Sequence, residues 1–159
     1  MEQELANRGE ERQLVVFGLA GELFGIEIAA VQEIIRMQNV TKLPNMPDFV
    51  EGVTNLRGKV IPVMNLRKRF RLPDAPQTAT TRIIVVEMNG TVAGMVVDAV
   101  QEVLRVSADQ IEPLREVRSS VDAEYLLGVA KVGERLIILL DLAKVWALQE
   151  SRDPLAVAN

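Results

Sequence analysis

The stretch Ala30-Val31-Gln32-Glu33-Ile34-Ile35-Arg36 occurs a second time, 69 positions later, as Ala99-Val100-Gln101-Glu102-Val103-Leu104-Arg105. The opening Ala-Val-Gln-Glu and the closing Arg are identical in the two copies, and the positions between them are aliphatic in both. At the same shift Leu14–Gly21 lies on Ile83–Gly90, which ends in the same glycine. Aliphatic strands resemble one another by chance, but chance does not keep polar residues and glycines in step. We therefore interpret the pattern as an internal duplication.

The two copies continue to match downstream at a larger shift of 76 positions. At this shift Val60–Leu66 lies on Leu136–Leu142, and Gly52-Val53 lies on Gly128-Val129. Phe70 falls on Trp146. The change of shift places a seven-residue insertion in the second copy, between about residues 107 and 124.

This pattern predicts the organisation of the chain. We expect one domain over residues 13–150, with repeat halves from about 13 to 72 and from about 80 to 148. The segments 1–12 and 151–159 are expected to be loose tails. Two similar halves imply two similar subdomains with a groove between them, and such grooves are favoured binding places. Whether each half folds on itself or exchanges strands with the other stays open.

Both copies are predicted to be mainly β-strand. Gln13–Leu19 and Arg82–Met88 are rich in Val, Ile and Phe, and turn signals, such as Asn89-Gly90, follow them. Asp141 can cap a helix over Leu142–Gln149, and Asn65 can cap a shorter turn over Leu66–Phe70. Further strands are expected at Leu23–Ile28, Val92–Val97, Glu33–Met37, Glu102–Val106, Val60–Val63 and Leu136–Leu140. Short strands in two copies suggest two small β-barrels.

Composition excludes many kinds of chemistry. The 159 residues contain no Cys and no His, which excludes thiolate nucleophiles, imidazole metal ligands and a Ser–His–Asp triad. The acids in apolar segments are isolated, without a spaced ligand set, so surface, cap or turn roles are expected of Glu27, Glu33, Asp98, Glu102 and Asp141. No catalytic constellation stands out, and we expect no cofactor and no metal site; an enzyme that uses paired carboxylates or a metal is kept as an alternative.

Other global features are bland. The net charge is −4, which gives no general attraction to nucleic acid. The polar start of the chain does not resemble a signal peptide, and the longest aliphatic run, Leu136–Leu140, is far too short to span a bilayer. The absence of cysteine suits a reducing cytosol.

The segment from residue 57 to residue 71 offers an alternative. It holds six basic residues and no acid, which allows a small β-barrel that binds nucleic acid through this segment. Phe70 is the one aromatic residue within it, so platforms for base stacking are almost lacking. We favour a protein that does not bind nucleic acid.

The same region resembles the CheW family of chemotaxis coupling proteins. Asn55-Leu-Arg-Gly-Lys-Val-Ile-Pro-Val-Met-Asn-Leu-Arg-Lys-Arg-Phe70 is close to that family's pattern N-L-R-G-x-V-I-P-V-x-D-L-R-x-x-F, with Asn65 where Asp is usual. Further matches are Phe24–Ile28, Gly94–Asp98 and Tyr125–Gly128, and the resemblance runs from about Gln13 to Leu148. It implies a mainly β fold of two five-stranded SH3-like barrel subdomains with a short C-terminal helix.

The resemblance also implies a function. Such proteins are non-enzymatic adaptors that couple methyl-accepting chemoreceptors to a CheA-type histidine kinase, each bound on a different surface. The receptor tip is a helical hairpin held along the groove between the subdomains. A monomer is expected that works inside a larger array. It is expected to be cytoplasmic and to reach membrane receptors through protein contacts alone.

The family's functional residues carry over to positions of this sequence. Arg57 is the main candidate for receptor binding, with Ile28, Val31 and Glu33 as its neighbours. The candidates for kinase binding are Gly52, Val40, Thr41, Val50 and, in the insertion, Val117. The plainer alternative is that Ile28, Val31 and Val50 belong to the core, and that Gly52 and Gly58 serve only the backbone.

Overall fold

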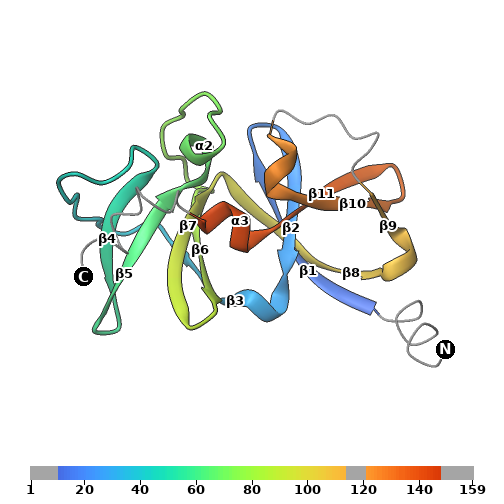
Figure 1. The fold of residues 1–159 in the computed structure, drawn as a ribbon, viewed down its shortest axis with the longest axis horizontal. Helices are drawn as coiled ribbons and strands as arrows, with labels where there is room; N and C mark the ends of the chain where they lie inside the picture. The colour runs from blue at the N-terminus through green and yellow to red at the C-terminus, as the bar shows by residue number, and fades with distance from the viewer. Residues whose placement is uncertain (1–10, 114–120, 148–159) are drawn as a thin grey trace.

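The computed structural model describes residues 11–113 and 121–147. Its strands form two sheets, which lie side by side in Figure 1. Subdomain A has the strand order β8-β1-β2-β11-β10-β9, and subdomain B has the order β3-β6-β7-β5-β4. The bounds in subdomain A are β1 (Glu11–Leu19), β2 (Glu22–Glu27), β8 (Ala99–Ser107), β9 (Ile111–Glu112), β10 (Leu126–Val132) and β11 (Arg135–Leu140). Those in subdomain B are β3 (Val31–Arg36), β4 (Val50–Leu56), β5 (Lys59–Asn65), β6 (Arg82–Met88) and β7 (Thr91–Val97).

The two sequence copies exchange strands. The hairpin β1–β2 of the first copy joins β8, β10 and β11 of the second copy, while β6–β7 joins β3, β4 and β5. The two sheets therefore have the same order of equivalent strands, apart from the additional short β9. The pairing of Leu139 with Gly25 in one sheet matches that of Val63 with Gly94 in the other. The shifts of 76 and 69 relate these positions, so the duplication is visible in three dimensions.

The exchanged hairpins are buried on both faces. In β1, Leu14 and Val16 face the interior of subdomain A, whereas Val15 and Phe17 enter a core shared by both subdomains. In β6, Ile83 and Val85 likewise face the interior of subdomain B, while the two residues that alternate with them enter the shared core. Successive strand side chains point to opposite faces, so burial of both requires an unbroken apolar run.

Each sheet is closed at its edge by a backbone contact beside a glycine. In subdomain B, the chain after β3 pairs with β4 through Thr41 and Val53, with N···O distances of 2.8 and 2.9 Å. In subdomain A, β9 pairs with β10 at the equivalent place, Glu112 with Val129. On the other side of these strands, the β4–β5 pairing shifts register beside Gly52, and the β10–β11 pairing shifts register beside Gly128. These bulges curl the two sheets in the same way.

One short helix follows β5, and another follows the equivalent strand β11. They are α2 (Leu66–Arg69) and α3 (Leu142–Trp146), and the side chains of Asn65 and Asp141 accept hydrogen bonds from the amides of Lys68 and Lys144. The predicted caps are confirmed. α3 is shorter than predicted because Ala147 leaves helical geometry, and Leu148 and Gln149 lie outside the described residues. The short 3₁₀ turns η1 (Ile28–Ala30), η2 (Ala108–Gln110) and η4 (Ala123–Tyr125) complete the fold.

Candidate functional site

Arg57 and Glu33 form a pair that spans the two edges of subdomain B. Arg57 lies in the turn between β4 and β5 at a φ of 53°, and its side chain is 76% exposed. Its Nη2 donates to Oε1 of Glu33 on β3 at 2.9 Å, and its Nη1 donates to Oε2. The two predicted neighbours are therefore brought together, and the pair holds the guanidinium in a defined place on the surface.

The second copy carries a counterpart of this pair. Glu102 is equivalent to Glu33, and it accepts a hydrogen bond from Nη1 of Arg135 at 2.7 Å. The arginine does not come from the position equivalent to Arg57, which is Gly133, but from two residues further along the hairpin. The side chains of Glu102 and Arg135 are 41% and 43% exposed. This pair offers a matched comparison for Arg57.

An apolar groove lies between the subdomains, at η1. Its volume is about 290 Å³, and its walls come from η1, the β6–β7 turn, β10 and the start of α3. Leu127, 58% exposed, forms part of its wall, and Glu27 and Asp141 are acids among its lining residues. Ile28 is 37% exposed and sits between the lining residues Glu27 and Ala30. Val31 is partly buried and packs against the shared core.

The kinase-side candidates gather around the edge closure of subdomain B. Thr41 crosses β4 at Gly52, where a Cβ would lie 2.0 Å from the Thr41 carbonyl oxygen. The φ of Gly52 is 146°, so its backbone also disfavours a side chain. Val40 is partly buried against the interior of subdomain B, and Val50 is buried at 8% exposure. Val117 lies outside the described residues.

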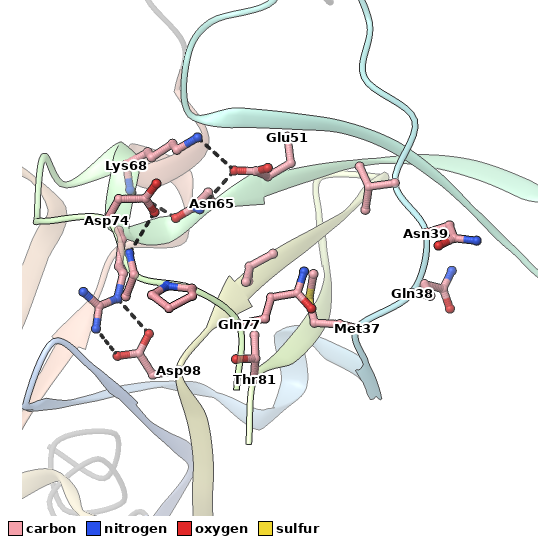
Figure 2. Close-up of a pocket in the computed structure, with 15 residues that line it drawn as sticks. Met37, Gln38, Asn39, Glu51, Asn65, Lys68, Asp74, Gln77, Thr81 and Asp98 are labelled. Atoms are coloured by element: carbon pink, nitrogen blue, oxygen red, sulfur yellow. Dashed lines mark hydrogen bonds and ion pairs between the residues drawn. The ribbon is translucent and has the colours of Figure 1, made fainter. Parts of the chain in front are cut away.

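A polar pocket of about 390 Å³ opens beside these residues (Figure 2). Val40, Glu51 and Asn65 are among its lining residues. Glu51 points toward Asn65 and Lys68, with its Oε1 3.0 Å from the Asn65 amide nitrogen and 3.4 Å from the Lys68 ammonium. Gln77 and Thr81 also line the pocket.

Arg67 and Asp98 lock one end of this pocket. The Arg67 Nε and Nη2 donate to the Asp98 carboxylate at 2.9 and 2.6 Å, and its Nη1 donates to the Pro73 carbonyl at 2.7 Å. The backbone amide of Ala20, in the β1–β2 turn of subdomain A, donates to the same carboxylate at 2.9 Å. Asp98 therefore ties α2 of subdomain B to a turn of subdomain A.

The contact between Arg67 and Asp98 favours the charged forms of both side chains. The hydrogen bonds from Arg67 are the main reason that the pKa of Asp98 lies below its usual value, and the Ala20 amide adds to them. Burial acts in the opposite direction but is the weaker influence on this carboxyl. The same contact raises the pKa of Arg67.

The basic segment 57–71 is largely occupied by contacts within the chain. Arg57, Arg67 and Lys68 pair with Glu33, Asp98 and Glu51. Arg69 donates to the carbonyls of Val145 and Ala147 at 2.8 and 3.1 Å, and it lies over the rings of Phe49 and Tyr125. This use of the side chains weighs against a nucleic-acid surface built from the segment.

A family model described as "CheW-like domain" matches residues 13–150. This chain belongs to the CheW family. Chemotaxis protein CheW of Klebsiella aerogenes is 39% identical over 147 residues, which cover 92% of this chain and 89% of that protein. The protein of the same name from Treponema pallidum is 34% identical and covers 92% of this chain, with 88% of its own length matched. The crystal structure of the scaffolding protein TtCheW from Thermoanaerobacter tengcongensis superposes with a TM-score of 0.84 at 38% identity, covering 90% of this chain and 97% of that one.

CheW membership makes this chain a chemotaxis scaffold protein, not an enzyme. Within residues 11–113 and 121–147, no three Asp or Glu side chains gather to hold a metal ion. No helix in this part of the chain is long and apolar enough to cross a membrane.

The sequence does not predict several residues that line the two sites. These are Glu51 and Arg67 in the polar pocket, and Leu127 and Ala143 in the apolar groove. Asp98 was expected to have only a surface, cap or turn role. A signal for them exists in the repeat, because Arg67 aligns with Ala143 and Asp98 with Ala29. Positions at which a charged residue of one copy aligns with an alanine of the other mark the places where the two copies diverge.

Proposed function

We propose that this protein couples methyl-accepting chemoreceptors to a CheA-type histidine kinase by binding each partner on a separate surface. Family membership supports the class of function, since the relatives are chemotaxis proteins and one is named as a scaffold. The observation that carries the proposal is the exposed Arg57 side chain, which Glu33 holds in place by hydrogen bonds. Glu33 lies on β3, which directly follows η1, and η1 contributes to the wall of the apolar groove. In this role the protein works in the cytoplasm as a monomer that joins receptor arrays.

The receptor side of the proposal uses Arg57, Glu33 and the groove at Ile28. A helical hairpin needs an apolar strip to cover and polar groups at the rim to fix its register. Ile28 and Leu127 supply exposed apolar surface, and Arg57 supplies a fork of hydrogen-bond donors. Val31 contributes by supporting this surface from beneath, because it packs into the shared core.

The kinase side of the proposal uses the closure of subdomain B. Val40 lines the polar pocket, and the next residue, Thr41, crosses β4 at Gly52. Val50 is buried and acts by holding β4 in place. Val117 belongs to the proposal as a second contact with the kinase, from the insertion in the second copy.

Replacing Arg57 by alanine tests the receptor side. The fold is expected to remain, because an exposed ion pair of this kind contributes about 1 kcal/mol or less to stability. Receptor-dependent stimulation of the kinase is expected to fall about tenfold, since Arg is a frequent source of interface energy. The measurement is kinase autophosphorylation in a reconstituted mixture of receptor, kinase and this protein.

Arg135→Ala is the matched control, because it breaks the equivalent pair in the second copy and removes the same side chain. This variant is expected to stimulate the kinase like the unchanged protein. Equal stimulation by the Arg57→Ala variant and the unchanged protein would rule out Arg57 as a receptor contact. Failure of the unchanged protein to bind either partner would refute the adaptor function itself.

A further inference from the structure

We infer that the apolar groove and the polar pocket are two copies of one junction between the subdomains, which the internal duplication produced and which have since diverged. In the receptor-side copy, the small side chains of Ala29 and Ala143 leave the junction open. The inference rests on the proposed function and adds the residues that decide which partner each surface accepts. In the kinase-side copy, Asp98 and Arg67 occupy the equivalent positions and lock the junction.

The equivalence is built into the linings of the apolar groove and the polar pocket. The repeat shifts of 69 and 76 positions align four residues that line the groove with four residues that line the pocket. These pairs are Glu27 with Val96, Leu127 with Glu51, Asp141 with Asn65, and Ala143 with Arg67. Asn65 and Asp141 cap their helices in the same way, on Lys68 and Lys144, so the surrounding backbone is also equivalent.

The divergence replaces a bridging ion pair by two small side chains. In the pocket, Arg67 reaches Asp98 and through it the amide of Ala20, which crosses from one subdomain to the other. Ala143, which lines the groove, and Ala29, which precedes the lining residue Ala30, stand at the positions equivalent to Arg67 and Asp98, and both alanines are exposed. Neither has a side chain that could bridge the junction. Leu127 at the position of Glu51 makes the same wall apolar.

The open copy fits the helical tip of a receptor that presents an apolar ridge and a basic side chain. The apolar walls suit the ridge, and the lining includes the acids Glu27 and Asp141 but no basic residue among the described ones. A partner's Lys or Arg beside these acids would stand roughly where Arg67 stands in the locked copy. The exposed Ile28, which belongs to the proposed receptor surface, directly follows the lining residue Glu27 in the chain.

The test installs the lock in the open copy. Ala29→Asp combined with Ala143→Arg is expected to close the groove and weaken binding of a soluble receptor fragment carrying the helical tip by about tenfold or more. Binding of the kinase is expected to stay within about twofold. Calorimetric titration of the full chain with each partner measures both, and thermal unfolding checks the fold. The matched control, Ala79→Asp with Ala123→Arg, adds the same side chains at exposed positions outside the groove.

The outcomes separate this inference from the proposed function. If the unchanged protein does not bind the receptor fragment, the proposed function fails. If it binds, but the locked variant binds equally well, or the control loses as much affinity, the inference is wrong. Loss of kinase binding with receptor binding retained would also overturn it. Leu127→Ala adds no bulk and serves if the locked variant does not fold; it is expected to weaken receptor binding several-fold, and unchanged binding would contradict the groove.

Discussion

Among the glycines that the structure describes, Gly52 is the one at which an added methyl group would make the closest contact. Its φ is 146°, and a Cβ would lie 2.0 Å from the carbonyl oxygen of Thr41, which the backbone pairing with Val53 holds in place. The obstacle is backbone, so it cannot turn away as a flexible side chain does. The need for glycine here follows from edge closure, independently of any partner.

Gly52→Ala is therefore expected to destabilise the fold by more than about 2 kcal/mol, since strained φ and a displaced strand pairing add together. Gly21→Ala is the control, because Gly21 also has a positive φ, of 82°, but open space around its Cβ. Gly21→Ala is expected to lower the free energy of unfolding by about 1 kcal/mol. Urea unfolding measures both. If the alanine variant at position 52 is as stable as the control, the closure of subdomain B is not the reason for this glycine.

Asp98 links three elements at once, so its titration reports on the junction between them. Its pKa is lower in the folded protein than the value of 3.8 for a free side chain, mainly because of the hydrogen bonds from Arg67. A lowered carboxyl pKa stabilises the fold above the unfolded pKa, and the stabilisation is lost as the pH falls through the folded pKa. Arg67 stays charged throughout, since its pKa is raised.

Asp98→Asn is thus expected to cost about 1 kcal/mol at neutral pH, a modest figure because the side chain is 36% exposed. The difference from the unchanged protein should be constant near neutrality and shrink below about pH 4. Unfolding at a series of pH values measures it. Glu102→Gln, at an exposed pair of the second copy, should change stability less at neutral pH. A difference that persists undiminished at pH 2 would mean that charge at position 98 is not involved.

Most strands of this protein could be predicted from the sequence, although β9 and β10 are not among them, and the pairing of the strands could not. The continuous apolar run in β1 identifies a strand buried on both faces, and Asn65 and Asp141 are recognisable caps from local chemistry. The pairing of Glu33 with Arg57 joins opposite edges of one sheet, which depends on how that sheet curls. Likewise Asp98 is one isolated acid until the fold places α2 and the β1–β2 turn beside it. Long-range geometry of this kind leaves no periodic trace in the sequence.

At the scale of the whole molecule, the exchange of hairpins joins the halves into one structure. Each half supplies a hairpin to the sheet of the other, as in a domain-swapped dimer whose two subunits have been fused into one chain. Phe17, Phe24, Phe70 and Tyr125 follow one another through the shared core, with ring centroids 5.9, 6.2 and 5.1 Å apart. A change in side-chain packing in one subdomain therefore affects the other through directly contacting side chains.

The exchange predicts what happens when the chain is divided in the exposed loop, into residues 1–78 and 79–159. A single half retains its hairpin but loses the strands that cover it, so Leu14 and Val16 of the first half would be exposed. Each half is expected to be unfolded as a monomer, and the equimolar mixture should regain β-structure and bind as a one-to-one complex. Circular dichroism and sedimentation measure this. A folded monomer of half length, in which β1–β2 had taken the place of β6–β7 in its own sheet, would contradict this expectation.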